Sequence, residues 1–284
     1  MEATQKLTQA GIGTARLDAL VLLEDVTGID RAKLLAEPDM ELSPEQVGKL
    51  EKLLNRRARH EPLAYIRGKT EFYGREFLLT PAVLEPRPES ETMIDLLKEL
   101  AAGSMAVPGS GHLKTKNSPA EVPGWRIADV GTGSGALGIT AKLELPNSQV
   151  ELLEIDPNAI KVAKTNVDKF TLNISVIKTD LLDGSNQNYD VFLCNLPYVP
   201  DYYQINTAAL HEPKIAIFGG PDGLDLYRKL FDQIKKLQHH PLYILLEALP
   251  PSHQQLTEIA RQASYDLIKT EDFIQLFFKP KSTA

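Results

Sequence analysis

The sequence contains almost nothing that could cross-link the chain covalently or through metal thiolates. Cys194 is the only cysteine among the 284 residues, which excludes an intrachain disulfide framework and a cysteine-ligated metal cluster. The residues before it, Val191, Phe192 and Leu193, are apolar. We therefore interpret Cys194 as a small apolar residue in a buried strand, and we expect packing to supply the stability.

The sequence also lacks long hydrophobic runs and an excess of basic residues. No apolar stretch approaches the roughly 20 residues that a membrane-spanning helix needs, and the first residues, MEATQK, lack the features of a secretory signal. The formal net charge is −7, whereas a broad nucleic-acid surface normally needs a basic face. We expect a cytoplasmic protein with no membrane partner and no direct nucleic-acid partner.

The sequence does contain enough apolar material for a large core. Hydrophobic residues make up 43% and charged residues 24% of the chain, a balance that is typical of folded globular proteins. A length of 284 residues fits one large domain or two ordinary ones.

Residues 1–68 have the pattern of a small helical domain. An apolar stripe over residues 17–23 is followed by Gly28, which predicts a helix end, and Asp30 is placed to cap a short second helix. Residues 43–46, Ser-Pro-Glu-Gln, combine a capping serine, a proline at the first helical position and a glutamine three residues after the cap. This combination predicts the start of a longer helix.

The longer helix ends in a cluster of arginines, at Arg56, Arg57 and Arg59. Cations suit the C-terminus of a helix because the last carbonyl groups carry partial negative charge. We interpret the cluster either as a solvated helix end or as a contact for a partner with acidic groups.

The next segments connect this domain to a second one. Aromatic and apolar residues around Gly74 in the segment 69–86 predict two short strands and a turn, a β-hairpin connector. Prolines and acids at 86–92 predict a helix start. Residues 101–124 are rich in Gly, Pro, Ser and Ala without periodicity, so we predict a flexible insertion in the second domain, residues 87–284.

From residue 125 onward, strand and helix patterns alternate, which predicts an α/β fold with a doubly wound, mostly parallel sheet of seven strands. Too few residues separate the last two strands for a crossover helix, so these two should form an antiparallel edge. The predicted strands cover residues 126–130, 149–154, 174–178, 190–194, 242–247, 265–269 and 273–278.

A glycine-rich segment, residues 129–138, follows the first of these strands. Its glycines allow close approach of the backbone to a ligand, and the next helix offers unpaired N–H groups. Glu154, which ends the second strand, can accept hydrogen bonds from both hydroxyls of a ribose, and Asp156 competes for this role. Asp180 follows the third strand, where it is placed to meet an adenine beside the apolar wall of Leu181.

This arrangement predicts a site for a nucleoside-bearing cofactor, either a dinucleotide or S-adenosylmethionine; a purely structural loop is the third possibility. No metal site is predicted. The residues expected to bind the cofactor are Asp129, Gly131, Thr132, Gly133, Ser134, Gly135, Glu154, Asp180, Leu181 and Asn195.

The fourth strand ends at the tetrapeptide Asn195-Leu196-Pro197-Tyr198, at the sheet edge where open α/β folds bind ligands. Asn195 offers one acceptor and two donors, and Pro197 keeps Leu196 extended, which leaves the Leu196 carbonyl directed toward a pocket. With Tyr198 as a stacking face, the group suits a planar carboxamide or adenine; the alternative is an ordinary strand-to-loop turn. A hydride-transferring enzyme has no need of this tetrapeptide, whereas a methyltransferase acting on nitrogen does, so the two motifs together favour S-adenosylmethionine.

The chain resembles the HemK-like peptide chain release factor N5-glutamine methyltransferases over nearly its whole length. The segments that carry the resemblance are RRARHEPLAYIRGKTEFYG, EPRPESE, DVGTGSG, EIDPNA, NLPY and EPKIAIFGGPDGLDLYRKL. The family pattern has proline where this chain has Leu196 and aspartate where it has Glu154. The resemblance implies S-adenosyl-L-methionine as methyl donor and the glutamine of a Gly-Gly-Gln loop in release factors as target. Because the pocket suits a carboxamide or an adenine equally, we expect residues 1–68 to supply substrate recognition.

For catalysis and substrate binding we expect the oxygen of the Asn195 side chain and the Leu196 carbonyl each to accept one N–H of the target amide, between Pro197 and Tyr198. Arg87 and Glu89 either shape the pocket or the domain junction, or have a purely structural role. Three alternative functions remain: a ribosomal-protein glutamine methyltransferase, a nucleic-acid adenine N6-methyltransferase with a similar tetrapeptide, and a binding module without turnover.

Overall fold

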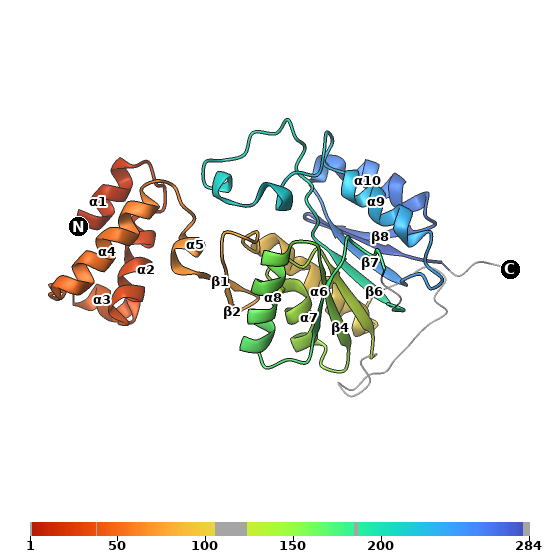
Figure 1. Cartoon of the computed structure of the whole chain (residues 1–284), viewed down its shortest axis with the longest axis horizontal. Helices are drawn as coiled ribbons and strands as arrows, with labels where there is room; N and C mark the ends of the chain where they lie inside the picture. Colours follow the sequence, from red (N-terminus) through yellow and green to blue (C-terminus); the bar gives the residue numbers. More distant parts are fainter. Residues whose placement is uncertain (1, 38, 106–123, 185–186, 281–284) are drawn as a thin grey trace. The chain divides into compact units, whose positions relative to one another are not determined.

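The computed structural model describes residues 2–37, 39–105, 124–184 and 187–280 (Figure 1). Most of the predicted insertion at 101–124 therefore lies outside the described residues. The chain divides into two compact units. We call the first the helical unit; it comprises Met1–Thr70, Leu79–Pro81 and Ile205–His211. We call the second the sheet unit; it comprises Glu71–Leu78, Ala82–Gln204 and Glu212–Ala284.

Local sequence signals set the helix ends of the helical unit. Gly28 ends its second helix with a left-handed φ of 69°, and the Asp30 carboxylate accepts a hydrogen bond of 2.8 Å from the Ala32 N–H. Ser43 and Gln46 form the predicted capping box, with each side chain bonded to the backbone N–H of the other residue. The helices are α1 (Glu2–Gln9), α2 (Ala15–Thr27), α3 (Arg31–Ala36), α4 (Pro44–Arg57) and α5 (Leu63–Arg67).

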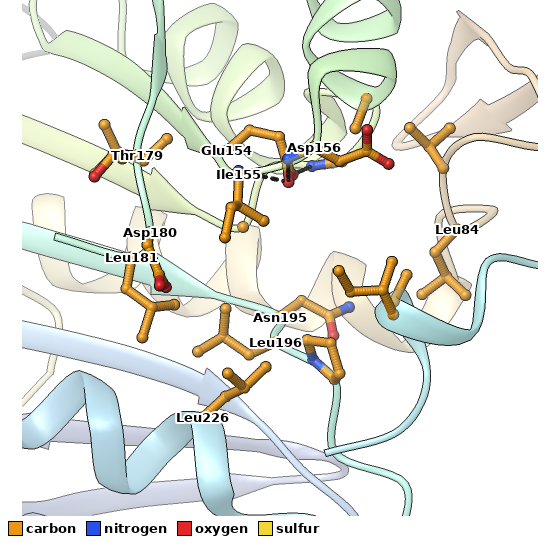
Figure 2. A pocket seen from close by; sticks show the side chains of 18 of the residues that line it. Leu84, Glu154, Ile155, Asp156, Thr179, Asp180, Leu181, Asn195, Leu196 and Leu226 are labelled. Atoms are coloured by element: carbon orange, nitrogen blue, oxygen red, sulfur yellow. Dashed lines mark hydrogen bonds between the residues drawn. The ribbon is translucent and has the colours of Figure 1, made fainter. Parts of the chain in front are cut away.

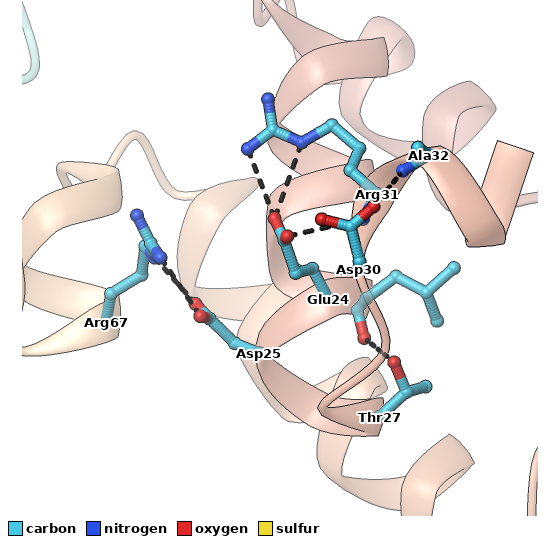
Figure 3. A network of polar contacts seen from close by, with 8 residues as sticks. Glu24, Asp25, Thr27, Asp30, Arg31, Ala32 and Arg67 are labelled. Carbon is cyan, nitrogen blue, oxygen red and sulfur yellow. Dashed lines mark hydrogen bonds and ion pairs between the residues drawn. The ribbon is translucent and has the colours of Figure 1, made fainter.

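Apolar packing and ion pairs join these helices. Leu7, Leu22 and Leu54 belong to one buried cluster. Figure 3 shows Arg67 of α5 paired with Asp25 of α2, with 2.6 Å between Nε and Oδ2, and Arg31 paired with Glu24. The arginine cluster at the end of α4 is divided: Arg57 pairs with the nearly buried Asp18 at 2.6 Å, and Arg56 pairs with Glu61. Both of these arginines hold the helical unit together, whereas Arg59 is exposed.

The predicted hairpin is present as strands β1 (Lys69–Phe72) and β2 (Arg75–Leu78). Both turn residues, Tyr73 and Gly74, have positive φ. Inside the sheet unit, the buried amide of Asn166 bonds to both the N–H and the carbonyl of Leu78, at 2.8 and 3.0 Å, and also donates to the Ser134 carbonyl at 2.8 Å. One side chain thus ties the hairpin to the glycine-rich segment.

The sheet has seven strands in the order β5-β4-β3-β6-β7-β9-β8, with β9 antiparallel to both of its neighbours. This confirms the predicted doubly wound α/β fold with an antiparallel edge. The strands are β3 (Arg126–Val130), β4 (Gln149–Glu154), β5 (Ser175–Lys178), β6 (Val191–Cys194), β7 (Tyr243–Glu247), β8 (Asp266–Glu271) and β9 (Ile274–Phe278).

Helices cover both faces of this sheet (Figure 1). The side chains of Ile127 and Leu193 pack in a cluster with α6 (Glu91–Ala101), α7 (Ala136–Glu144) and α8 (Pro157–Lys169). Their neighbours Ala128 and Phe192 point to the other face, against α9 (Asp225–Ile234) and α10 (His253–Arg261). Strands buried on both faces explain the apolar runs in the sequence, and each large apolar side chain buried there contributes about 2 kcal/mol.

The strand order places the functional edge of the sheet. Chain connections from β3 lead through β4 to one side and those from β6 lead through β7 to the other, so β3 and β6 lie side by side at the point where the order reverses. Ligands of open α/β sheets bind outside the carboxyl ends of the strands at this point. Within the described part of the chain, no helix combines the length and apolar character needed to cross a bilayer.

Candidate active site

A cavity of about 250 Å3 lies at the carboxyl ends of β3, β4 and β6. Figure 2 shows Glu154, Asp180 and Asn195 around it, with apolar walls from Leu84, Leu181 and Leu226. A smaller cavity of about 60 Å3 is lined by Ser90, Asp129, Thr132 and Asn195, among others. The structure therefore brings the glycine-rich segment, the acids after β4 and β5 and the tetrapeptide to one edge of the sheet.

The glycine-rich segment approaches the cavity with its backbone. Gly131, Gly133 and Gly135 all have positive φ, a conformation that other residues adopt only with strain. A Cβ atom on Gly133 would meet no atom within 4 Å, so this backbone borders open space. A Cβ on Gly131 would lie 2.8 Å from the Leu196 side chain, so the segment packs directly on the tetrapeptide.

Asp129 holds the glycine-rich segment from inside. Its Oδ2 accepts hydrogen bonds from the Thr132 hydroxyl at 2.5 Å and from the Gly138 N–H, at the start of α7, at 2.8 Å. Burial raises the pKa of the Asp129 carboxyl to about 6, against the opposite effect of these two bonds. The side chains of Asp129 and Thr132 thus position the backbone that borders the cavity.

The two acids at the carboxyl end of β4 are used differently. Glu154 is nearly buried: its Oε2 accepts the Gly133 N–H at 2.9 Å, and its Oε1 accepts the N–H groups of Ile155 and Asp156 at 2.8 and 3.0 Å. Asp156 caps α8 through the N–H of Asn158 at 2.8 Å. Two N–H groups fill the acceptor sites of Glu154 Oε1, so Oε2 keeps one acceptor site for a ligand, whereas one oxygen of Asp156 is committed to its helix.

Asp180 has a partner that the sequence did not point out. Its Oδ2 lies 2.5 Å from Nζ of Lys229 on α9, and both side chains line the cavity. Gln233, one turn further along α9, accepts a hydrogen bond of 2.8 Å from the Leu182 N–H. Leu181, with a φ of 56°, is buried against the cavity. Helix α9 therefore fixes the acid that was predicted to meet an adenine.

Hydrogen bonds to neighbouring elements fix the tetrapeptide. Asn195 Nδ2 donates to Ser90 Oγ at 3.0 Å, and Ser90 Oγ donates to Glu247 Oε2 at 2.5 Å. The Tyr198 hydroxyl donates to the other oxygen, Glu247 Oε1, at 3.0 Å. Burial is the main cause that raises the pKa values of both Glu247 and Tyr198.

The Leu196 carbonyl was predicted to be directed toward a pocket. Leu196 lines the larger cavity, and the buried Tyr227 hydroxyl lies 3.5 Å from its carbonyl oxygen. The nearer acceptor for that hydroxyl is the backbone carbonyl of Glu247. A carbonyl oxygen has two acceptor sites, so the Leu196 carbonyl retains capacity for another donor.

Glycines support the tetrapeptide from behind. The backbone after Tyr198 pairs with residues 217–220, including a 3.0 Å bond from the Gly219 N–H to the Val199 carbonyl. A Cβ on Gly219 would collide with the Pro197 carbonyl, and a Cβ on Gly223 would collide with the Tyr198 carbonyl. Two main-chain segments can approach this closely only where side chains are absent.

Arg87 and Glu89 lie before α6: Arg87 directly precedes the short 3-10 helix Pro88–Ser90, and Glu89 is part of it. Arg87 makes hydrogen bonds of 2.8 and 2.6 Å to both oxygens of Glu212, whose side chain is only 2% exposed. Burial raises the pKa of Glu212 against the opposite effect of Arg87. Glu89 is exposed. Neither Arg87 nor Glu89 is among the residues that line the two cavities.

Three polar residues of the site were missed by sequence reasoning: Ser90, Lys229 and Glu247. Glu247 left a signal, because an acid at the end of the apolar run Tyr243–Leu246 stands at the carboxyl end of a predicted buried strand. Ser90 and Lys229 left none, since a serine near a helix start and a lysine on an amphipathic helix are common.

Comparison with known proteins identifies the family. Residues 1–68 match the family model of the PrmC N-terminal domain, and residues 112–212 match that of the Methyltransferase small domain. The release factor glutamine methyltransferase of Koribacter versatilis is 34% identical over 82% of this chain and 78% of the relative. That of Moorella thermoacetica is 33% identical over 92% of this chain and 87% of the relative.

The chain belongs to the release factor glutamine methyltransferase family. This confirms the resemblance found in the sequence segments. Other relatives of this chain are longer. The bifunctional methyltransferase of Rickettsia typhi is 35% identical over 86% of this chain but only 48% of the relative. The chain spans about half the length of these Rickettsia proteins.

Solved structures agree on the methyltransferase fold. A Thermus thermophilus 16S rRNA N2 G1207 methyltransferase in complex with AdoMet and guanosine has a TM-score of 0.51 and 16% identity, over 75% of this chain and 50% of that one. Human methyltransferase 10 domain containing protein has a TM-score of 0.50 and 19% identity, over 74% and 90%. At these identities the similarity shows the fold alone.

Proposed function

We propose that this protein transfers a methyl group from S-adenosylmethionine to the side-chain amide nitrogen, N5, of the glutamine in the Gly-Gly-Gln loop of a peptide chain release factor. The observation that carries the proposal is the setting of Asn195 at the cavity edge. Its Nδ2 is bonded to Ser90, which leaves Oδ1 as an acceptor for a substrate N–H. Relatives named release factor glutamine methyltransferases support the choice of substrate.

The cavity residues fit the cofactor chemically. The backbone at Gly133 borders open space, as a ligand resting on a main-chain segment requires. Glu154 Oε2 keeps an acceptor site suited to a ribose hydroxyl, and Asp180 with Leu181 offers an acceptor beside an apolar wall, which suits an adenine. When bound, S-adenosylmethionine supplies a methyl group already activated by a positively charged sulfur.

In the proposed mechanism the protein positions the target nitrogen. An amide nitrogen is a weak nucleophile because its lone pair is delocalised into the carbonyl. Asn195 Oδ1 and the Leu196 carbonyl each accept one of its N–H groups, while Pro197 and Tyr198 enclose the amide plane. Tyr198 cannot turn freely because its hydroxyl is bonded to Glu247. Fixed dipoles replace the hydration of the amide and hold it in a reactive orientation.

Recognition of a whole release factor is assigned in this proposal to residues 1–68, which match the PrmC N-terminal domain model. The hairpin region 69–86 then acts as connector and residues 87–284 as the methyltransferase domain. Binding energy from contacts far from the glutamine contributes to catalysis. A short Gly-Gly-Gln peptide should therefore be a much poorer substrate than the intact factor.

The test is methyl transfer with three acceptors: an intact release factor, ribosomal proteins and ribosomal RNA. We expect mass spectrometry to find one added methyl group on the Gly-Gly-Gln glutamine. Robust methylation of ribosomal RNA adenines, with none on that glutamine, would overturn the assignment.

Asn195→Ala tests the role of the amide acceptor. We expect kcat to fall on the order of 100-fold or more, while the Kd for S-adenosylhomocysteine, measured by calorimetry, changes little. Asn173→Ala, at an exposed asparagine before β5, is the matched control and should behave like the unmodified protein. An Asn195→Ala variant that retains full turnover would contradict the proposed mechanism.

A further inference from the structure

The buried hydroxyl of Ser90 lies between the tetrapeptide and the carboxylate of Glu247, which is not among the residues that line the two cavities described above. Ser90 is 2% exposed and Glu247 is fully buried. Register pairs Cys194 with Leu246, so the residues that follow occupy corresponding positions: Asn195 directly after β6, and Glu247 as the last residue of β7. Ser90, at the end of the short 3-10 helix Pro88–Ser90, reaches both of them.

The direction of these hydrogen bonds follows from the number of protons available. Glu247 Oε2 accepts a hydrogen bond from Ser90, and Oε1 accepts one from Tyr198. The Asn195 side chain adds a smaller hydrogen-bond contribution, which lowers the pKa of Glu247 and likewise directs the Asn195 NH2 toward this carboxylate. A serine hydroxyl has one proton, so once it is donated to Glu247 only lone pairs remain toward Asn195. The Asn195 group that can bond to those lone pairs is its NH2.

The reverse orientation of the Asn195 amide is disfavoured. Turning the amide over would set Asn195 Oδ1 against Ser90 Oγ, two acceptors in contact, unless Ser90 withdrew its proton from Glu247. A buried carboxylate that loses a donor is costly, on the order of a lost charged hydrogen bond. Glu247 therefore determines, through Ser90, which atom of Asn195 faces the cavity.

We infer that Ser90 is a positioning residue: held by Glu247, it keeps the Asn195 amide turned so that Oδ1, and not NH2, meets the substrate nitrogen. The inference builds on the proposed function, because it explains how the acceptor for a substrate N–H is kept in place. It applies equally to the NH2 of a carboxamide and to the amino group of an adenine. Ser90 itself contacts no reacting atom.

The first experiment compares Ser90→Ala with Ser148→Ala. Ser148 is also fully buried, and its hydroxyl has no hydrogen-bond partner among the described residues, so it is a matched control for removing a buried hydroxyl. For Ser90→Ala we expect kcat to fall on the order of 10- to 100-fold, with the KM for the release factor and the Kd for S-adenosylhomocysteine within about twofold. Ser148→Ala should retain the original kcat.

The second experiment places Ser90→Ala in an Asn195→Ala background. A residue that acts only by orienting Asn195 has nothing left to orient, so the double variant should have the same kcat as Asn195→Ala alone. A further loss in the double variant would show that Ser90 acts elsewhere and would overturn the inference.

The third experiment requires no turnover. The side-chain NH2 signals of Asn195, identified by their loss in Asn195→Ala, can be followed in 15N–1H spectra. We expect them to be protected from solvent exchange in the unmodified protein and exposed in Ser90→Ala. Equal protection in both proteins, or an undiminished kcat in Ser90→Ala, would overturn the inference.

These outcomes separate the inference from the proposed function. If the unmodified protein methylates ribosomal protein or ribosomal RNA in place of the release factor, the proposed substrate is wrong, and the same Ser90 comparison is made on the acceptor that is methylated. The NH2 measurement depends on no substrate at all.

Discussion

Asp129 is a buried carboxyl group that stabilises the glycine-rich segment through two hydrogen bonds while burial opposes its ionisation. In the unfolded chain its pKa returns to the usual value near 3.8, whereas in the folded protein burial, with a smaller contribution from Glu154, raises it to about 6. Between these pH values the unfolded chain releases a proton that the folded protein retains. Ionisation of Asp129 therefore favours the unfolded state.

The contribution of Asp129 to the free energy of unfolding decreases as pH rises from about 4 to about 6 and is then constant; its total size is on the order of 3 kcal/mol. Asp129→Asn should remove this decrease. Thermal unfolding at several pH values checks it, with Asp266→Asn, at an exposed position, as a control that keeps the original profile. An unchanged profile in Asp129→Asn would contradict the expected titration.

Among single residues, sequence reasoning anticipated those whose role depends on a local motif. Asn195 follows one predicted strand and Glu154 ends another, and both line the cavity; their roles in binding stay predictions. Ser90 and Glu247 were not anticipated, because the bonds of Ser90 join it to residues 105 and 157 positions away in the chain. A sequence pattern cannot indicate which distant hydroxyl meets which carboxylate.

The elements themselves follow closely from local physics. The capping box at Ser43 and the glycine end of α2 at Gly28 were predicted because the groups that satisfy a helix end lie within four residues of it. The apolar runs predicted the five central strands because strands buried on both faces need no alternation. The edge strands β5 and β8 are mostly exposed. The arginine cluster could not be divided in advance: the pairing of Arg57 with Asp18 spans 39 residues.

The backbone of the tetrapeptide packs against the backbone of the glycines at 219–223. Gly223 has a φ of 80°, and a Cβ there would collide with the Tyr198 carbonyl. We expect Gly223→Ala to lower the free energy of unfolding by about 2–3 kcal/mol and to reduce kcat, because Tyr198 must shift. Urea unfolding and turnover measure the two effects.

Gly74 provides the matched control for this substitution. Its φ is 68°, close to that of Gly223, but a Cβ there would meet no atom within 4 Å. Gly74→Ala should therefore cost only the strain of the left-handed conformation, about 1 kcal/mol, and leave kcat unchanged. Equal effects of the two substitutions would show that the contact with Tyr198 is unimportant.

At the scale of the whole molecule, the two units have separate cores and separate chemistry. The cavities are lined by residues of the sheet unit. The helical unit includes Ile205–His211 from far along the chain, and the charge of His211 contributes to the lowered pKa of Glu61, after the larger effect of the hydrogen bond from Arg56. No sequence pattern marked that segment, because membership of a unit depends on contacts between distant residues.

The arginines at and just after the end of α4 allow the proposed recognition role of the helical unit to be tested. Arg57→Ala leaves the nearly buried Asp18 without its partner, so it should lower the free energy of unfolding by about 2 kcal/mol. Arg59→Ala changes an exposed side chain and should leave stability nearly unchanged. If the arginine cluster contacts acidic groups of the substrate, Arg59→Ala should raise the KM for the release factor about fivefold.

Steady-state kinetics with the intact factor and calorimetric unfolding separate these effects. Neither variant should alter the Kd for S-adenosylhomocysteine, since both residues lie in the helical unit. A KM that stays the same in Arg59→Ala would assign the cluster to the solvated helix end that the sequence also allowed.

The lone thiol of the chain has a consequence of its own. Cys194 is completely buried, directly before Asn195 on the central strand β6, and burial raises its pKa well above the usual value. An alkylating reagent reacts with the thiolate, and it can reach the sulfur only while β6 is open. Because no second cysteine competes for the reagent, the rate of alkylation measures how often the strand before the tetrapeptide opens. A ligand that binds at the end of this strand would lower the alkylation rate, so one chemical label reports both the opening of the fold and the occupancy of the site.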